Sequence, residues 1–165
     1  MKRIVIAVVL LVVIGLAAFY FEIGVSAAVK RDRALSSAKS YLEKGKVDEA
    51  IIELKNALKA DPASPEAHHE LGLVLMKKGD IRTAYAEFVR ATDLKPDFIK
   101  ARYQLATLQL RGRDTKQAKQ QLEKLRAQDK DSEESRYLAA QIAMAEKDPD
   151  TALYGELHAA LMNET

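Results

Sequence analysis

The chain has 165 residues, enough for a single core of ordinary size, and its formal net charge at pH 7 is only +2. Lys2 and Arg3 account for that excess, because residues 22–165 carry 24 basic and 24 acidic side chains in interspersed order. A balanced surface lacks the clustered positive charge that displaces counterions from nucleic acid, so we expect no nucleic-acid partner. The absence of cysteine excludes disulfides, thiolate nucleophiles and CxxC metal sites.

Residues 4–21, IVIAVVLLVVIGLAAFYF, form an unbroken run without a charged or strongly polar side chain. As a helix this run would be about 27 Å long, close to the hydrocarbon thickness of a bilayer, and its last three residues are the aromatic type that collects at membrane interfaces. The run is longer than the apolar region of most signal peptides, although the small residues at 25–28 also fit a cleavage site. We therefore expect a retained transmembrane anchor, with a cleaved signal peptide as the alternative.

The charges around this run set the expected orientation. Lys2, Arg3 and the α-amino group favour a cytoplasmic N-terminus by the positive-inside rule. Basic residues at 30, 31 and 33 follow the run at a distance and are diluted by Asp32, whereas Glu22 directly abuts it. The sequence thus predicts a single-pass inner (cytoplasmic) membrane protein, with residues 1–28 as tip, span and linker and residues 29–165 as a periplasmic domain. A cytosol-facing domain is the alternative.

The remaining chain repeats a spaced set of small residues every 34 residues. Residues 42–62 (LEKGKVDEAIIELKNALKADP) and 76–96 (MKKGDIRTAYAEFVRATDLKP) share a KG pair, two alanines and a final proline. When units are counted from residues 31, 65, 99 and 133, small residues recur at positions 8 and 20: Ala38, Gly72, Ala106 and Ala140, then Ala50, Ala84, Ala118 and Ala152. Small residues let helix axes approach closely, so the repeat indicates an array of packed helix pairs.

Residues that end or cap helices recur between these small positions: Gly45, Gly79, Asp80, Asp114, Asp148, Pro62 and Pro96. Glycines are expected to end the first helix of a unit, aspartates to cap the second, and prolines to terminate it. The expected fold is therefore all-α, an N-terminal transmembrane helix followed by a short solenoid of three to four helix–turn–helix units. These units lie near residues 31–64, 65–98, 99–132 and 133–165.

The pattern resembles the tetratricopeptide repeat (TPR), whose signature combines Leu-Gly, an aromatic residue, two alanines and a terminal proline at these intervals. The second unit matches best, through Leu71, Gly72, Ala84, Phe88, Ala91 and Pro96. The first unit has Ser37-Ala38 in place of Leu-Gly, the third lacks the proline, and the fourth keeps only the small residues. A generic helical bundle is the alternative. The resemblance, which covers residues 31–165, implies a curved surface for a protein partner rather than a reaction.

No motif for catalysis or metal binding accompanies the repeat. His68 and His69 are adjacent, so on a helix their side chains diverge by about 100° and cannot share a metal ion. His158 has no histidine or cysteine at ligand spacing, and no nucleophile elbow, phosphate-binding glycine loop or HExxH sequence occurs. We expect no enzyme, no cofactor and no metal. An enzyme would instead need a pocket of clustered titratable groups.

The resemblance implies that the first helix of each unit lines a concave face, with positions 2, 5, 9, 12 and 13 directed into it. The candidate partner-binding groove then consists of His69, Leu73, Met76, Tyr103, Thr107, Leu110, Tyr137, Gln141 and Met144. Tyrosine and methionine give adaptable apolar contacts, which suits the capture of a peptide or helix, whereas packing on a neighbouring helix is the alternative for each residue. Some TPR proteins hold a terminal carboxylate with a clamp of lysines and asparagines. Here the corresponding positions include Glu66 and Glu70, which argues against that ligand.

The last helix, expected over residues 151–163, carries a second stripe at four-residue spacing, made of Tyr154, His158 and Met162. We expect another protein, or a second copy of the chain in a homodimer, to cover this stripe, with a solvated stripe as the alternative. Together these features predict a non-catalytic, membrane-tethered protein–protein interaction scaffold or adaptor in the assembly or organisation of a bacterial envelope complex. A permanent accessory subunit of an export or respiratory membrane complex is the alternative function.

Overall fold

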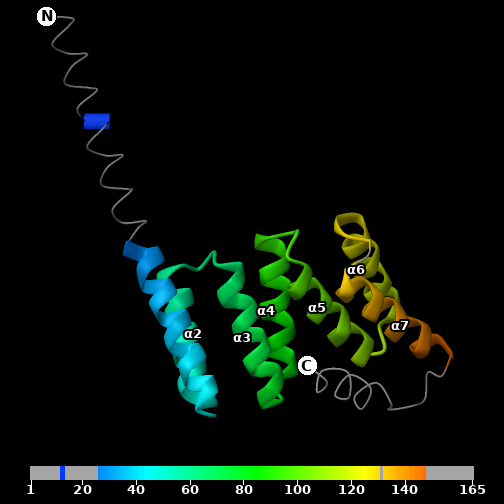
Figure 1. Ribbon diagram of the computed structural model, residues 1–165, viewed down its shortest axis with the longest axis horizontal. Helices are drawn as coiled ribbons and strands as arrows, with labels where there is room; N and C mark the ends of the chain where they lie inside the picture. Colours follow the sequence, from blue (N-terminus) through cyan, green and yellow to red (C-terminus); the bar gives the residue numbers. More distant parts are fainter. Residues whose placement is uncertain (1–11, 14–25, 131, 148–165) are drawn as a thin grey trace, which may run out of the picture. The chain divides into compact units, whose positions relative to one another are not determined.

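The computed structural model describes residues 12–13, 26–130 and 132–147, and Figure 1 shows the helices in sequence colours. Throughout this described part the chain is all-α, as expected: residues 26–43 are helical and six further helices follow. They are α2 (Val47–Ala60), α3 (Pro65–Lys78), α4 (Ile81–Leu94), α5 (Ile99–Arg111), α6 (Thr115–Gln128) and α7 (Glu133–Lys147). By its internal contacts the chain divides into two compact units, Met1–Ala67 and His68–Thr165.

The predicted transmembrane anchor falls almost wholly outside the described residues. Of residues 4–21 only Val12 and Val13 are described, and both are helical and exposed. Within the described ranges no helix combines the length and apolar character that crossing a bilayer requires. The predictions for the rest of the anchor, the linker up to residue 25 and the last helix, including Asp148, Tyr154, His158 and Met162, lie outside the described residues.

The helices repeat with the period expected from the sequence. α3, α5 and α7 begin at Pro65, Ile99 and Glu133, and these starts are 34 residues apart. α2, α4 and α6 begin at residues 47, 81 and 115, with the same spacing. Pairs of helices therefore follow one another in a helix–turn–helix repeat, and α3, α5 and α7 start where the sequence places the second, third and fourth units.

The turn inside each pair has the same backbone geometry in three successive repeats. Gly45 and Gly79 have φ angles of 70° and 89°, and Arg113, at the equivalent place in the third repeat, has a φ angle of 61°. The backbone N–H of each donates to the carbonyl three residues earlier, at 3.0, 3.1 and 2.8 Å. Left-handed backbone suits glycine because a Cβ atom crowds the carbonyl there. The repeat thus imposes this conformation on Arg113 as well.

Aspartate side chains cap two of the second helices, as the sequence predicts. Asp80 Oδ1 accepts a hydrogen bond from the backbone N–H of Thr83 at 3.1 Å, and Asp114 Oδ1 accepts one from Gln117 at 2.9 Å. These bonds satisfy N–H groups that the first helical turn leaves without intrahelical partners. The bonds to Thr83 lower the pKa of the Asp80 carboxyl.

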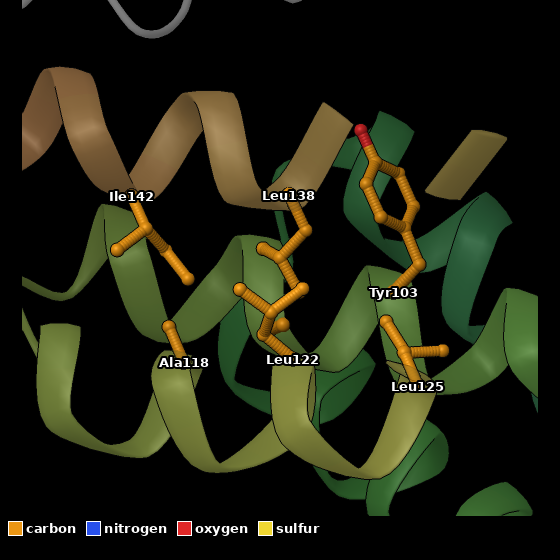
Figure 2. Close-up of a cluster of buried hydrophobic side chains, with 7 residues drawn as sticks. Tyr103, Ala118, Leu122, Leu125, Leu138 and Ile142 are labelled. Carbon is orange, nitrogen blue, oxygen red and sulfur yellow. The ribbon is translucent and has the colours of Figure 1, made fainter. Parts of the chain in front are cut away.

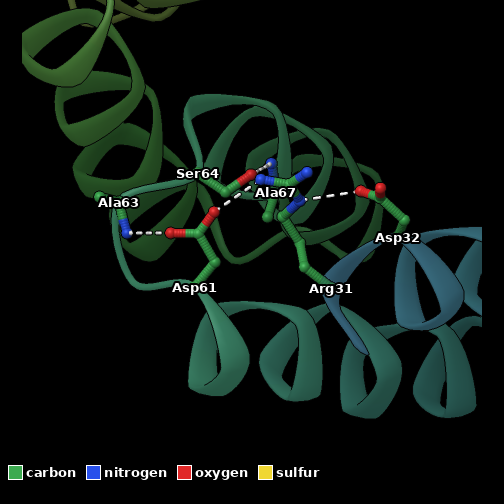
Figure 3. Close-up of polar contacts among 6 residues, drawn as sticks. All are labelled: Arg31, Asp32, Asp61, Ala63, Ser64 and Ala67. Atoms are coloured by element: carbon green, nitrogen blue, oxygen red, sulfur yellow. Dashed lines mark hydrogen bonds and ion pairs between the residues drawn. The ribbon is translucent and has the colours of Figure 1, made fainter. Parts of the chain in front are cut away.

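In the Met1–Ala67 unit, small apolar residues and one ion pair hold the helices together. Ala34, Ala57 and Ala67 form a buried cluster in which the helix axes can approach closely. Figure 3 shows the guanidinium of Arg31 extending across to Asp61, with Nη1 2.7 Å from Oδ2. Asp61 Oδ1 also accepts from the backbone N–H of Ala63 at 3.1 Å. Arg31 thereby ties the helical segment 26–43 to the turn that leads into α3.

In the His68–Thr165 unit, one cluster of buried side chains lies among α5, α6 and α7. It contains Tyr103, Ala106, Ala118, Leu122, Leu125, Leu138 and Ile142. Figure 2 shows Leu138 and Ile142 of α7 directed toward Leu122 and Ala118 of α6. The spacing of four residues on each helix brings these side chains onto one face, so the two helices bury apolar surface against each other.

A glycine–phenylalanine contact packs α3 against α4 in the same unit. A Cβ atom built on Gly72 would lie 2.7 Å from Cε1 of Phe88, whose side chain is completely buried. Only a residue without a side chain fits at this distance, so the Leu-Gly and aromatic positions of the repeat are physically coupled.

Candidate functional site

The nine predicted groove residues all lie in the His68–Thr165 unit, and they differ in accessibility. His69, Tyr103, Thr107 and Gln141 are buried, with 5%, 8%, 4% and 8% of their surface exposed. Leu73, Met76, Leu110 and Met144 are half-buried. Tyr137 is 37% exposed. The side chains available to a partner are therefore those of the last five residues, whereas the first four pack mainly inside the domain.

Tyr103 connects α5 to α7. Its hydroxyl accepts a hydrogen bond from Gln141 Nε2 at 3.2 Å, and its backbone carbonyl accepts one from Thr107 Oγ1 at 3.0 Å. The ring belongs to the buried cluster with Leu122 and Leu138 (Figure 2). Burial raises the pKa of the Tyr103 hydroxyl, and the hydrogen bond from Gln141 opposes this shift only in part. Tyr103 thus positions the inner surfaces of α5 and α7 and offers little surface of its own.

The two adjacent histidines also take part in packing. The ring of His69 lies 5.0 Å from that of Phe98 and 5.9 Å from that of Phe88, centroid to centroid. His68 Nδ1 is 2.6 Å from a carboxylate oxygen of Glu87 on α4. His69 therefore fills space between aromatic side chains, and His68 joins α3 to α4. In the part of the chain that the structure describes, no group of three or more His, Asp or Glu side chains could hold a metal ion.

Part of the accessible groove is an apolar surface on α5 and α7. We call it the α5–α7 face and define it by Leu110, Tyr137 and Met144, whereas Gln141, between the last two in sequence, is buried and bonded to Tyr103. Tyr137, Gln141 and Met144 are spaced by four and three residues, so they lie on one side of α7. Leu110 packs against the edge of the buried cluster and is only half-buried, so one side of it stays available. The face can bury apolar area against a partner, and Leu110, Tyr137 and Met144 include no nucleophile or carboxylic acid.

Polar residues buried in α5 were not anticipated from the sequence. Arg102 is 6% exposed, and its Nη1 donates to Gln121 Oε1 at 2.9 Å while Nη2 donates to the carbonyl of Pro96. Burial lowers the pKa of this guanidinium. Among the described residues, Arg102 Nε and the Oε1 atoms of Gln104 and Gln109 have no hydrogen-bond partner. The repeat register could have indicated the burial of Arg102, because this residue occupies position 4 of its unit, where TPR units often have a tryptophan.

The positions of a terminal-carboxylate clamp do not supply a cationic pocket in this unit. Glu70 lies 3.3 Å from Nδ1 of His69, Gln104 is buried, and Lys100 is exposed. The clamp positions in this unit therefore include one carboxylate and one buried amide, and the mismatch with a chaperone-tail ligand stays a prediction.

Comparison with known families matches two stretches of the chain. A family model described as TPR repeat matches residues 38–79, and one described as tetratricopeptide repeat matches residues 75–142. Superkiller complex protein 3 of Homo sapiens is 32% identical over 69 residues, which are 42% of this chain and 4% of that protein. Tetratricopeptide repeat protein 37 of Xenopus laevis matches with the same identity and coverage. The chain thus spans only 4% of the length of these curated relatives.

Solved structures share the fold. The first TPR of Spaghetti (RPAP3), bound to the HSP90 peptide SRMEEVD, has a TM-score of 0.65 at 20% identity and covers 70% of this chain and 92% of that chain. The TPR2B domain of yeast Sti1, in a complex with pHsp70, has a TM-score of 0.65 at 20% identity, with 73% and 98% covered. MamA from Desulfovibrio magneticus has a TM-score of 0.63 at 23% identity, with 72% and 67% covered. At these identities the likeness concerns the fold alone.

Proposed function

Because residues 38–142 of this chain carry tetratricopeptide repeats, we propose that it is a non-catalytic protein–protein interaction scaffold that binds a peptide or helix of its partner. The observation that carries this proposal is the α5–α7 face. Tyr137 exposes 37% of its surface, and Met144 on the same side of α7 and Leu110 on α5 are each half-buried. Exposed aromatic and methionine side chains are the kind that dominate binding energy when a partner buries them.

The chemistry of this face favours an apolar partner segment over an acidic chain terminus. The Spaghetti repeat binds the acidic peptide SRMEEVD. Here the clamp positions include the carboxylate of Glu70, next to the buried His69, and the buried Gln104, so we expect a terminal carboxylate to meet a negative charge without a matching clamp. The partner expected for the α5–α7 face presents leucine-, isoleucine- or phenylalanine-type side chains at helical spacing.

The apolar run at residues 4–21 supports a further part of the proposal, a membrane anchor. With the basic tip at Lys2 and Arg3, it favours an inner-membrane protein whose repeats face the periplasm and organise an envelope complex. A permanent accessory subunit of a membrane complex is the alternative role, and the stripe of Tyr154, His158 and Met162 is proposed to bind that complex or a second copy of the chain. A reporter enzyme fused after Thr165 tests the orientation, because it should be active only outside the cytoplasm.

A photo-crosslinking amino acid placed at Tyr137 tests the partner-binding role. Tyr85 on α4 is the matched control, because it is a tyrosine of nearly the same exposure, 36% against 37%, outside the α5–α7 face. We expect a discrete crosslinked partner in intact cells from position 137 and none from position 85. With the purified partner, Tyr137→Ala should raise Kd by roughly tenfold or more, the effect of losing about 1–3 kcal/mol, while helicity stays unchanged. Equal crosslinking from both positions would remove the basis for assigning the face.

A further inference from the structure

The Met1–Ala67 unit contains a hollow of about 460 Å³ between the helical segment 26–43 and α2. The helical segment contributes Lys30, Arg33, Ala34 and Ser37, and α2 contributes Glu53, Asn56, Lys59 and Ala60. This volume lies within the range of about 300–1,000 Å³ that is usual for small-ligand sites. Ala34 and Ala60 have short side chains, so they leave empty space among the longer polar side chains of the lining.

Positive charge gathers at this hollow. Lys30 and Arg33 are three residues apart on one helix, so they are neighbours on its surface, and Lys59 comes from the facing helix. Glu53 is the one acidic group in the lining, which leaves a formal net charge of +2. None of the three cations forms an ion pair with a described residue, whereas Arg31, between the first two in sequence, is bonded to both Asp32 and Asp61. The fold therefore uses Arg31 internally and leaves three cations around the hollow.

We propose that this hollow binds a phosphate-bearing anion. Two ammonium groups and one guanidinium can surround the phosphate from two sides, and guanidinium groups match phosphate oxygens with paired hydrogen bonds. Ser37 and Asn56 supply a hydroxyl and an amide as neutral donors in the same lining. The volume of about 460 Å³ leaves room for a phosphate that carries a further group, such as a glycerol.

The position of the hollow in the chain favours an anionic lipid headgroup as the source of that phosphate. Lys30 follows the end of the apolar run at residue 21 by nine residues, which span at most about 30 Å in any conformation. A chain anchored through residues 4–21 therefore keeps the hollow near the headgroup layer, where basic side chains attract anionic lipids. The choice of lipid rests on the proposed anchor, but phosphate binding itself does not.

Amine footprinting of the full chain in vesicles tests this proposal. The protein is reconstituted in neutral phosphatidylcholine vesicles, in the same vesicles with inorganic phosphate at matched ionic strength, and in vesicles containing phosphatidylglycerol. The rate of lysine acylation is then measured residue by residue by mass spectrometry. Lys30 and Lys59 report on the hollow, and Lys55, exposed on α2 and outside the lining, is the internal control. Arg33→Gln is the test variant, because it removes a cation without touching either reporter lysine.

We expect acylation of Lys30 and Lys59 to slow together, at least threefold relative to Lys55, and this protection to fall by more than half in Arg33→Gln. Protection only with phosphatidylglycerol identifies the lipid headgroup, and protection by inorganic phosphate as well shows that free phosphate suffices. If acylation slowed at Lys30 alone, the protection would come only from a basic stretch lying beside the membrane, and the proposed site would be refuted. The site would also be refuted if the acylation rates stayed unchanged with both inorganic phosphate and phosphatidylglycerol. The same holds if Lys59 remained protected in Arg33→Gln. Flotation with neutral vesicles tests the anchor separately, and if the chain does not float, the inorganic phosphate arm alone decides the site.

Discussion

Replacing Gly72 with alanine should destabilise the repeat domain, although alanine is the better helix former. The new Cβ atom would lie 2.7 Å from Cε1 and 2.9 Å from two further carbons of Phe88, about 0.7 Å inside the closest ordinary contact distance of 3.4 Å. Phe88 has no exposed surface, so its ring cannot swing into solvent to relieve the contact. Overpacking of this kind costs about 1–3 kcal/mol, and the gain in helix propensity offsets about 1 kcal/mol of it. We expect a net loss of up to about 2 kcal/mol.

Thermal unfolding of the full chain, followed by circular dichroism in a neutral detergent, measures this loss as a decrease in Tm of several degrees. Gly112→Ala is the matched control, because its Cβ atom would meet only backbone oxygens at 3.4 and 3.5 Å and its φ angle of −77° is ordinary for alanine. Combining Gly72→Ala with Phe88→Leu should recover at least about 1 kcal/mol relative to the sum of the single changes, since the smaller side chain vacates the contact. The reasoning fails if Gly72→Ala raises Tm, or if the two changes are simply additive.

Three further changes test the turns and the α5–α7 connection by the same melting assay. Arg113→Gly should stabilise the chain by about 1 kcal/mol, because it relieves a left-handed conformation with φ at 61°; an unchanged Tm would show that the backbone is relaxed there. Tyr103→Phe should cost about 1 kcal/mol at pH 7 by removing the bond from Gln141. Since the folded pKa of Tyr103 is raised above 10.0, its contribution is complete below pH 10 and is lost as the pH rises further, so the variant should lose less stability there. Asp80→Ala should lower Tm at pH 7 by removing the cap on Thr83. Because the folded pKa of Asp80 is lowered from 3.8, that difference should vanish as the pH falls through the folded pKa.

The repeat frame could be predicted from the sequence because each of its residues acts through a local or size-based rule. Glycine at positions 45 and 79 indicates a left-handed turn, and aspartate at 80 and 114 indicates a helix cap, without reference to distant residues. The coupling of Gly72 to an aromatic residue sixteen positions later follows from the repeat signature and appears as a direct contact. The turn and cap rules depend on local backbone geometry, which one short segment of chain largely determines, and the Gly72–Phe88 rule depends on side-chain size.

The candidate sites were less predictable because exposure depends on several helices at once. Tyr103 and Tyr137 occupy the same position of successive repeats, yet Tyr103 is 8% exposed and Tyr137 is 37% exposed. α7 covers the first through Gln141, and no register argument reveals this difference. The cationic hollow is a similar case. Lys30 and Arg33 are three residues apart in the sequence, but Lys59 lies at the same hollow only because α2 packs against the helical segment 26–43.

The third unit departs from the repeat pattern at a strained position and at a buried one. Arg113 takes the left-handed conformation that glycine has in the two units before it, and Arg102 is buried at a position where an aromatic side chain is usual. Buried amide oxygens of Gln104 and Gln109 have no hydrogen-bond partner among the described residues. Each of these features costs free energy: backbone strain at Arg113, burial of a cation that only neutral acceptors bind at Arg102, and unpaired buried polar atoms. Sequences depart from folding rules mainly where function requires it, and α5 is also the helix that contributes Leu110 to the α5–α7 face. The distribution of these costly residues therefore agrees with a partner-binding role for this part of the repeat, independently of the exposure of Tyr137.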